Sequence, residues 1–152
     1  MGDAALLNAI LRVHSSPHDF NILNPPAPTP TQIDHFWEVQ IVVDIIRPRL
    51  GDNWYTVPIG QFMDLSSFVN EHRNMFRINA AVNQEKKAIP LAEYMPQAHD
   101  PLITAYLDSQ LQDGGTVRDS VRALAEAMRD RRATYANLTN FVGQELCNYM
   151  GW

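Results

Sequence analysis

Four arginines after Thr116 have the types and spacing that could do chemistry. They follow one another at steps of four, seven and three residues, which places them on one face of a helix: Arg118, Arg122, Arg129 and Arg132. Guanidinium groups form planar, bidentate contacts with phosphate and carboxylate groups. A row of them on a rigid helix predicts a surface that binds phosphates without reading a base sequence.

The same face has a second interpretation, as an ordinary solvated helix surface. Asp119, Glu126 and Asp130 run beside the arginines, and Arg122 stands one turn before Glu126. Exposed pairs of this spacing contribute only a few tenths of a kcal/mol to stability. The pattern alone leaves both interpretations open.

No pattern in the chain predicts catalysis, a metal or a cofactor. His14 and His18 are four residues apart, but Pro17 between them argues against a shared helix face. Cys147 is the single cysteine, so it has no partner for an internal disulfide. The sequence contains neither a glycine-rich phosphate loop nor a nucleophile elbow. We therefore expect no enzyme activity and no cofactor.

The composition describes a folded chain with a single domain-sized core. Of 152 residues, 45% are apolar and 19% charged, which excludes a disordered chain. The net charge of −5 argues against binding to duplexes through a global positive field, although all but two of the 12 cationic side chains are arginine. No apolar run approaches the roughly 20 residues of a membrane helix, so we expect no membrane partner.

Hydrophobic periodicity predicts an all-α fold. We expect helices over residues 3–13, 32–47, 64–82, from Pro101 to the Asp113-Gly114-Gly115 turn, 116–133 and 135–149. Thr31 and Asp34 resemble a capping box for the second of these, and Thr116 and Asp119 for the fifth. The run from Val39 to Ile45 also alternates as a strand would.

The middle helices, at 32–47, 64–82, after Pro101 and at 116–133, predict a four-helix bundle core within a domain of residues 32–152. Five large side chains are assigned to this core: Trp37, Phe68, Phe76, Leu107 and Phe141.

Residues 1–31 are expected to form a short helix followed by a proline-rich arm. Prolines at 17, 25, 26, 28 and 30 fix the backbone and remove hydrogen-bond donors. Such an arm is a linker or a strap over a neighbouring subunit, in which case Pro25 and Pro26 make subunit contacts. Trp152, near the end of the last predicted helix, is a further candidate for a contact between subunits, unless it folds back.

Three motifs resemble the coat proteins of rod-shaped plant viruses, the tobacco mosaic virus family. They are Asp34-His-Phe-Trp37, His99-Asp-Pro-Leu-Ile-Thr-Ala-Tyr-Leu107 and Thr116-Val-Arg-Asp-Ser-Val-Arg122, followed by Tyr135, Phe141 and Trp152. The likeness covers about the last third of the chain. It implies a four-helix bundle that stacks in a helical array around single-stranded RNA, with Arg118 and Arg122 in the region that matches best.

The sequence departs from that family in two places. The family has a long inner loop between the two helices that here flank Asp113-Gly114-Gly115, and in this chain that loop is nearly absent. The spacing from Phe141 to Trp152 is also longer than in the family pattern. The proline-rich arm has no counterpart there, and the coat proteins of flexible filamentous viruses would explain it equally well.

Our functional expectation is a structural coat protein that assembles with itself helically and coats single-stranded RNA. Its locations would be the virion and the host cytoplasm. The alternative is a small helical adaptor or regulatory module that binds a protein partner without nucleic acid.

Overall fold

A computed structural model of the chain describes residues 2–12, 21–24, 31–79, 101–111 and 114–152. The described elements are α1 (Gly2–Leu11), β1 (Asn21–Asn24), β2 (Thr31–His35), α2 (Val39–Leu50), the 3-10 helix η1 (Gly51–Thr56), α3 (Ile59–Val69), the 3-10 helix η2 (His72–Asn74), β3 (Met75–Asn79), α5 (Pro101–Asp108), β4 (Gln110–Leu111), α6 (Val117–Arg129) and α7 (Asn137–Met150).

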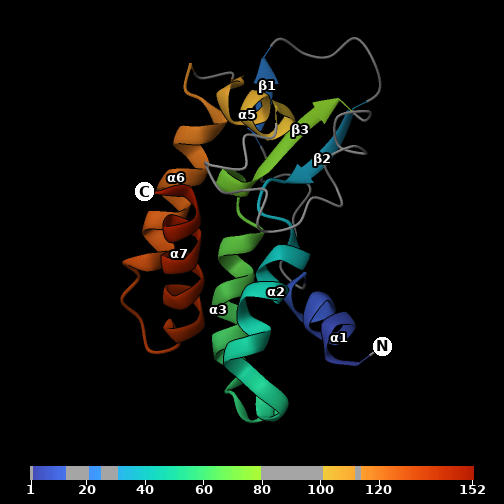
Figure 1. Ribbon diagram of the computed structural model, residues 1–152, viewed down its shortest axis with the longest axis vertical. Coiled ribbons are helices and arrows are strands. Elements are labelled where there is room, and N and C mark those ends of the chain that lie inside the picture. The colour runs from blue at the N-terminus through green and yellow to red at the C-terminus, as the bar shows by residue number, and fades with distance from the viewer. Residues whose placement is uncertain (1, 13–20, 25–30, 80–100, 112–113) are drawn as a thin grey trace.

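The helices and the strands occupy different ends of the molecule (Figure 1). The four strands form one sheet in the order β2-β3-β1-β4, and α5 lies beside it. β3 pairs antiparallel with β2 and parallel with β1, whereas β1 and β4 are antiparallel. The other five α-helices form the opposite end, with α7 in contact with α6, α3 and α2. The expectation of a mostly helical chain is confirmed, and the sheet is an addition that periodicity did not predict.

The first and last helices of the helical end agree with the expected segments. α1 packs against α2 and α3, and its Leu7 and Leu11 are buried in the common core. α7 spans the predicted segment at 135–149 almost completely. Strand β1 falls within the predicted arm, while Pro25 and Pro26 lie outside the described residues.

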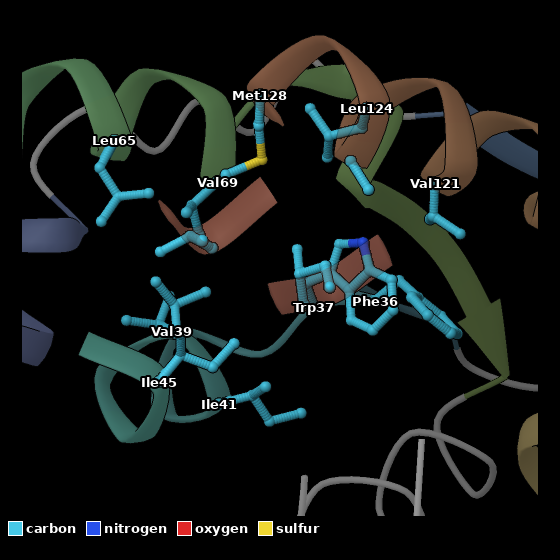
Figure 2. Close-up of a cluster of buried hydrophobic side chains, with 14 of the residues drawn as sticks. Phe36, Trp37, Val39, Ile41, Ile45, Leu65, Val69, Val121, Leu124 and Met128 are labelled. Carbon is cyan, nitrogen blue, oxygen red and sulfur yellow. The ribbon is translucent and has the colours of Figure 1, made fainter. Parts of the chain in front are cut away.

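The core fills the space between α2, α3, α6 and α7 (Figure 2). Trp37, Phe76 and Leu107 are buried, and Phe68 and Phe141 are half-buried against the same cluster. Phe76 reaches the core from strand β3, although the sequence placed it on a helix.

The predicted helix over 32–47 is wrong over residues 32–38. Residues 31–35 form strand β2, and the helix begins at Val39. The cause is Asn74, whose side chain accepts from the Trp37 N–H at 2.7 Å and donates to the Trp37 carbonyl at 3.1 Å. These bonds occupy the backbone groups that a helix would use. Asp34 does not cap a helix, and instead its buried carboxylate accepts from the Tyr106 hydroxyl at 3.0 Å.

The predicted helix over 64–82 is wrong over residues 70–79, and residues 80–82 lie outside the described residues. α3 begins earlier, at Ile59, and ends at Val69, because the Asn70 side chain donates both to the Ser66 carbonyl and to the Leu11 carbonyl. The chain then passes through η2 into β3, whose five residues all pair with β2. Spacings of three and four among apolar residues fitted a helix there, but long-range strand pairing decides the conformation.

The helix expected after Pro101 is shorter than its apolar pattern suggests. α5 ends at Asp108, and Gln110 and Leu111 pair with β1 as strand β4. α5 therefore lies with the sheet, and the position expected for it beside the long helices is taken by α7.

Candidate nucleic-acid interface

Helix α6 is built locally by its cap and its apolar stripe. The Asp119 N–H donates to the Thr116 hydroxyl at 3.0 Å and the Thr116 N–H to the Asp119 carboxylate at 3.4 Å, so the predicted capping box is confirmed. The buried side consists of Val117, Val121, Leu124, Ala125 and Met128. Burial of this side leaves the predicted arginines on the outer part of the helix.

Contact with α7 holds α6 rigidly. An ideal Cβ on Gly143 would lie 2.2 Å from the Arg129 backbone nitrogen, so the two backbones touch where the helices cross. The Asn140 side chain of α7 donates to the carbonyls of Met128, Arg129 and Arg131, at 3.0, 3.1 and 2.8 Å. The carboxyl end of α6 is therefore satisfied by its neighbour. The capping box at the amino end and Asn140 at the carboxyl end therefore fix the position of a binding surface on α6.

Arg118 and Arg122, the two arginines nearest the amino end, form exposed ion pairs. An Arg118 guanidinium nitrogen lies 3.0 Å from the Asp108 carboxylate at the end of α5. Arg122 pairs with Glu126 at 2.7 Å, as the spacing of the sequence predicted. The Arg122 side chain keeps 54% of its surface exposed. Exposed pairs are weak, so both guanidinium groups stay accessible to a stronger anion.

Arg129 makes a two-pronged contact with its neighbour Asp130. The nitrogens Nε and Nη2 donate to the two carboxylate oxygens at 2.9 and 3.0 Å. This hydrogen bonding raises the pKa of Arg129 and lowers the pKa of Asp130. The third nitrogen, Nη1, lies 3.8 Å from the Cys147 sulfur. Burial raises the pKa of that thiol, which keeps it protonated.

Arg132 lies beyond the carboxyl end of α6. The predicted helix over 116–133 ends at Arg129, and the following turn carries Arg132 as an exposed side chain. The structure therefore mounts Arg118, Arg122 and Arg129 on the helix and places the fourth predicted arginine in the connection to α7.

No family model, curated protein or solved structure matches the chain. The resemblance to viral coat proteins therefore rests on the motifs quoted above.

Among residues 2–12, 21–24, 31–79, 101–111 and 114–152, no three His, Cys, Asp or Glu side chains come together in the manner of a metal site. In the same parts of the chain, no helix combines the length and hydropathy that a membrane crossing needs.

Trp152 folds back onto its own chain. Its ring packs edge-on against Trp37, with 6.2 Å between the ring centres, and its backbone N–H donates to the Cys147 carbonyl at 2.9 Å. The side chain is half-buried against the core. The most exposed large apolar side chains of the described residues are instead Tyr55 and Ile59, at 70% and 63%.

Two further arginines, which no sequence pattern singled out, make contacts between helices. Arg131 pairs with Asp64 of α3 at 2.8 Å, and the Thr139 hydroxyl donates to the other oxygen of Asp64 at 2.6 Å. This network fastens the turn between α6 and α7 to α3. Arg49 lies at the end of α2, with its guanidinium 4.4 Å from the Phe141 ring centre. Helical spacing gave no signal for either contact, because the partners are distant in the chain.

Proposed function

We propose that this protein is a structural coat subunit that assembles with itself helically and binds the phosphates of single-stranded RNA through the arginines of α6. The observation that carries the proposal is the alignment of Arg118, Arg122 and Arg129 along the outer part of a helix whose other side is buried. From the first to the third of these residues, the helix rises by about 16 Å. A row of this length contacts several phosphates without reading bases.

The carboxylates beside the arginines set the affinity rather than forbid binding. Asp108, Glu126 and Asp130 each hold one guanidinium, through contacts at the surface. Exposed pairs contribute about 0–1 kcal/mol, whereas a polyanion binds many cations at once and releases condensed counterions. We propose that phosphates displace the carboxylates when the chain meets RNA, and that free subunits keep the pairs.

Within this proposal, the subunit core is a four-helix bundle made by α2, α3, α6 and α7. Pro25 and Pro26 belong to an arm that reaches a neighbouring subunit, and the exposed Tyr55 and Ile59 supply apolar surface for a contact between copies. A helical array needs two different surfaces that fit each other on successive subunits. The proposed locations are the virion and the host cytoplasm.

Electron microscopy of the purified protein tests the proposal, together with its absorbance at 260 and 280 nm. We expect rods or filaments with excess absorbance at 260 nm, because packaged RNA absorbs there. The double variant Arg118→Ala, Arg122→Ala should lose most of that excess. The matched control is Arg12→Ala, Arg47→Ala, which removes the same charge from exposed positions outside α6. Particles of the α6 variant that hold as much RNA as the control would overturn the proposal.

A protein-binding module without nucleic acid is the second candidate, and two observations favour it. The three arginines on α6 all have carboxylate partners, and Tyr55 and Ile59 are exposed near the end away from the sheet. A protein that stays monomeric at high concentration and carries no nucleic acid would support this candidate. The Trp37 and Trp152 rings are not available as such a surface, because they pack on each other.

A further inference from the structure

A polar groove lies where α2 and α6 end and α7 begins, at the end of the molecule away from the sheet (Figure 1). Its volume is about 370 Å³. Two arginines, three amide side chains and one aromatic ring line it: Arg49, Arg129, Asn137, Asn140, Phe141 and Gln144. Among the described residues no carboxylate lines the groove, so the formal charge of this lining is positive.

Arg49 is the exposed cation of this groove. No described carboxylate forms an ion pair with it, and its guanidinium lies over the face of Phe141 at 4.4 Å from the ring centre. A guanidinium that stacks on a ring keeps its N–H donors in its own plane, at the edge and free for hydrogen bonds. The stacking also restricts the side chain, so less conformational entropy is lost when an anion binds.

Arg129 brings the second positive charge from a different helix. Asp130, which holds two of its nitrogens, is 66% exposed and does not line the groove. An anion in the groove therefore competes with a solvated carboxylate, and that competition lowers its affinity by a modest factor.

Two of the three amide side chains add donors to the groove, whereas the amide nitrogen of Asn140 is already occupied. Asn140 is held in place, because its nitrogen donates to three carbonyls at the end of α6. Asn137 and Gln144 are exposed on α7 and can donate to an anion. Gln144 has one amide N–H for this, because the other donates to the Asn148 side chain at 2.8 Å. The amino end of α7 also favours an anion, because the aligned peptide dipoles of a helix give this end a partial positive charge. The N-cap residue, Ala136, makes no side-chain hydrogen bond to the first turn.

From this arrangement we infer that the groove binds a phosphate group, with Arg49 and Arg129 as the charged contacts. Planar guanidinium donors from two helices, α2 and α6, together with amide donors from α7, suit a tetrahedral anion with several acceptor oxygens. The groove is open at the surface, so the phosphate can belong to a free small molecule or to a polynucleotide. Of the arginines in the proposed RNA surface, only Arg129 is shared.

Calorimetric titration of the full chain with pyrophosphate and, separately, with a five-nucleotide oligouridylate tests the inference. We expect Arg49→Gln to weaken pyrophosphate binding at least about tenfold, since it removes one charge-assisted contact. Arg47→Gln is the control, because Arg47 is exposed on the same turn but lines a different pocket with Leu7 and Trp54. Equal binding by the wild type and Arg49→Gln, or no binding of either probe by the wild type, overturns the inference.

Asp130→Asn gives a result that loss of structure cannot imitate. Removal of the competing carboxylate frees Arg129, so pyrophosphate should bind this variant several-fold more tightly than the wild type. An unchanged or weaker affinity would count against Arg129 as a contact.

The two probes separate the source of the phosphate and the two proposals. If oligouridylate binds more tightly than pyrophosphate and depends on Arg49, the groove accepts a polynucleotide, whereas dependence for pyrophosphate alone indicates a small phosphate compound. If oligouridylate binding depends on Arg118 and Arg122 while neither probe depends on Arg49, the coat proposal stands and the groove inference fails. If binding depends on Arg49 but not on Arg118 and Arg122, the groove inference stands and the proposal that α6 binds RNA fails.

Discussion

Different interactions stabilise the two ends of this molecule. At the junction with the sheet, buried polar side chains fix the backbone: Asn74 contacts Trp37 and Val69, and Asn70 contacts Leu11 and His35. At the α6–α7 end, two backbones meet at a glycine, and the ion pairs of Arg118, Arg122 and Arg129 lie at the surface. A polar group that is buried among fixed partners serves the fold, whereas the solvated arginines of α6 keep the freedom to bind a partner.

The largest loss of stability should come from a substitution among the buried polar side chains at the junction with the sheet. We expect Asn74→Ala to lower the free energy of unfolding by about 4 kcal/mol, because the Trp37 N–H, the Trp37 carbonyl and the Val69 carbonyl lose a buried partner. Urea denaturation measures the change, with the exposed Asn53→Ala as control. A loss below about 1 kcal/mol would mean that Asn74 does not hold the junction.

Close packing at the other end should give the next largest effect. Gly143→Ala places a methyl group against the Arg129 backbone, so we expect a loss of about 2 to 3 kcal/mol, although alanine normally favours a helix over glycine. Thermal unfolding of this variant beside the exposed Gln144→Ala measures it. If Gly143→Ala is as stable as the wild type, α6 and α7 do not cross as described.

A smaller loss is expected at the amino end of α6. Thr116→Ala removes the acceptor of the Asp119 N–H and should cost about 1 kcal/mol. The matched control is Thr104→Ala, at an exposed position inside α5. Equal stability of the two variants would show that the cap does not stabilise α6, the helix that carries the arginines.

The smallest effect should appear at acid pH. The hydrogen bond from Arg129 lowers the pKa of Asp130 in the folded state, so its contribution to stability is present above the unfolded pKa of about 4 and is lost as the pH falls through the lower folded value. The stability of Asp130→Asn should therefore fall slightly less than that of the wild type below about pH 4. Parallel curves in that range would exclude a contribution from this pair.

The difference between the two ends also explains what the sequence could predict. The α6 cap, its apolar stripe and the Arg122–Glu126 pair depend on residues within a few positions of each other, and all three were predicted. Strands β2 and β3 depend on Asn74 meeting Trp37 across 37 positions, which no local pattern encodes. The helix predicted over the run from Val39 to Ile45 is confirmed, and the strand-like alternation there arises because α2 is buried on several sides.

The candidate site follows the same rule. The row of arginines on α6 was visible in the sequence, since helical spacing alone creates it. The groove was not, because Arg49, Arg129 and Phe141 lie far apart in the chain and meet only after α2, α6 and α7 pack. Arg132 was assigned to the row because the end of α6 could not be placed from a pattern that continues past Arg129.

The salt dependence of RNA binding tests the central claim most directly. We would measure the affinity of a labelled oligouridylate by fluorescence anisotropy over a range of salt concentrations, for the wild type and for Arg118→Ala, Arg122→Ala. If both arginines contact phosphates, the slope of log affinity against log salt should become shallower by about 1.4, since each contact on a single strand contributes about 0.7. Identical slopes for the two proteins would contradict the proposal that α6 binds RNA.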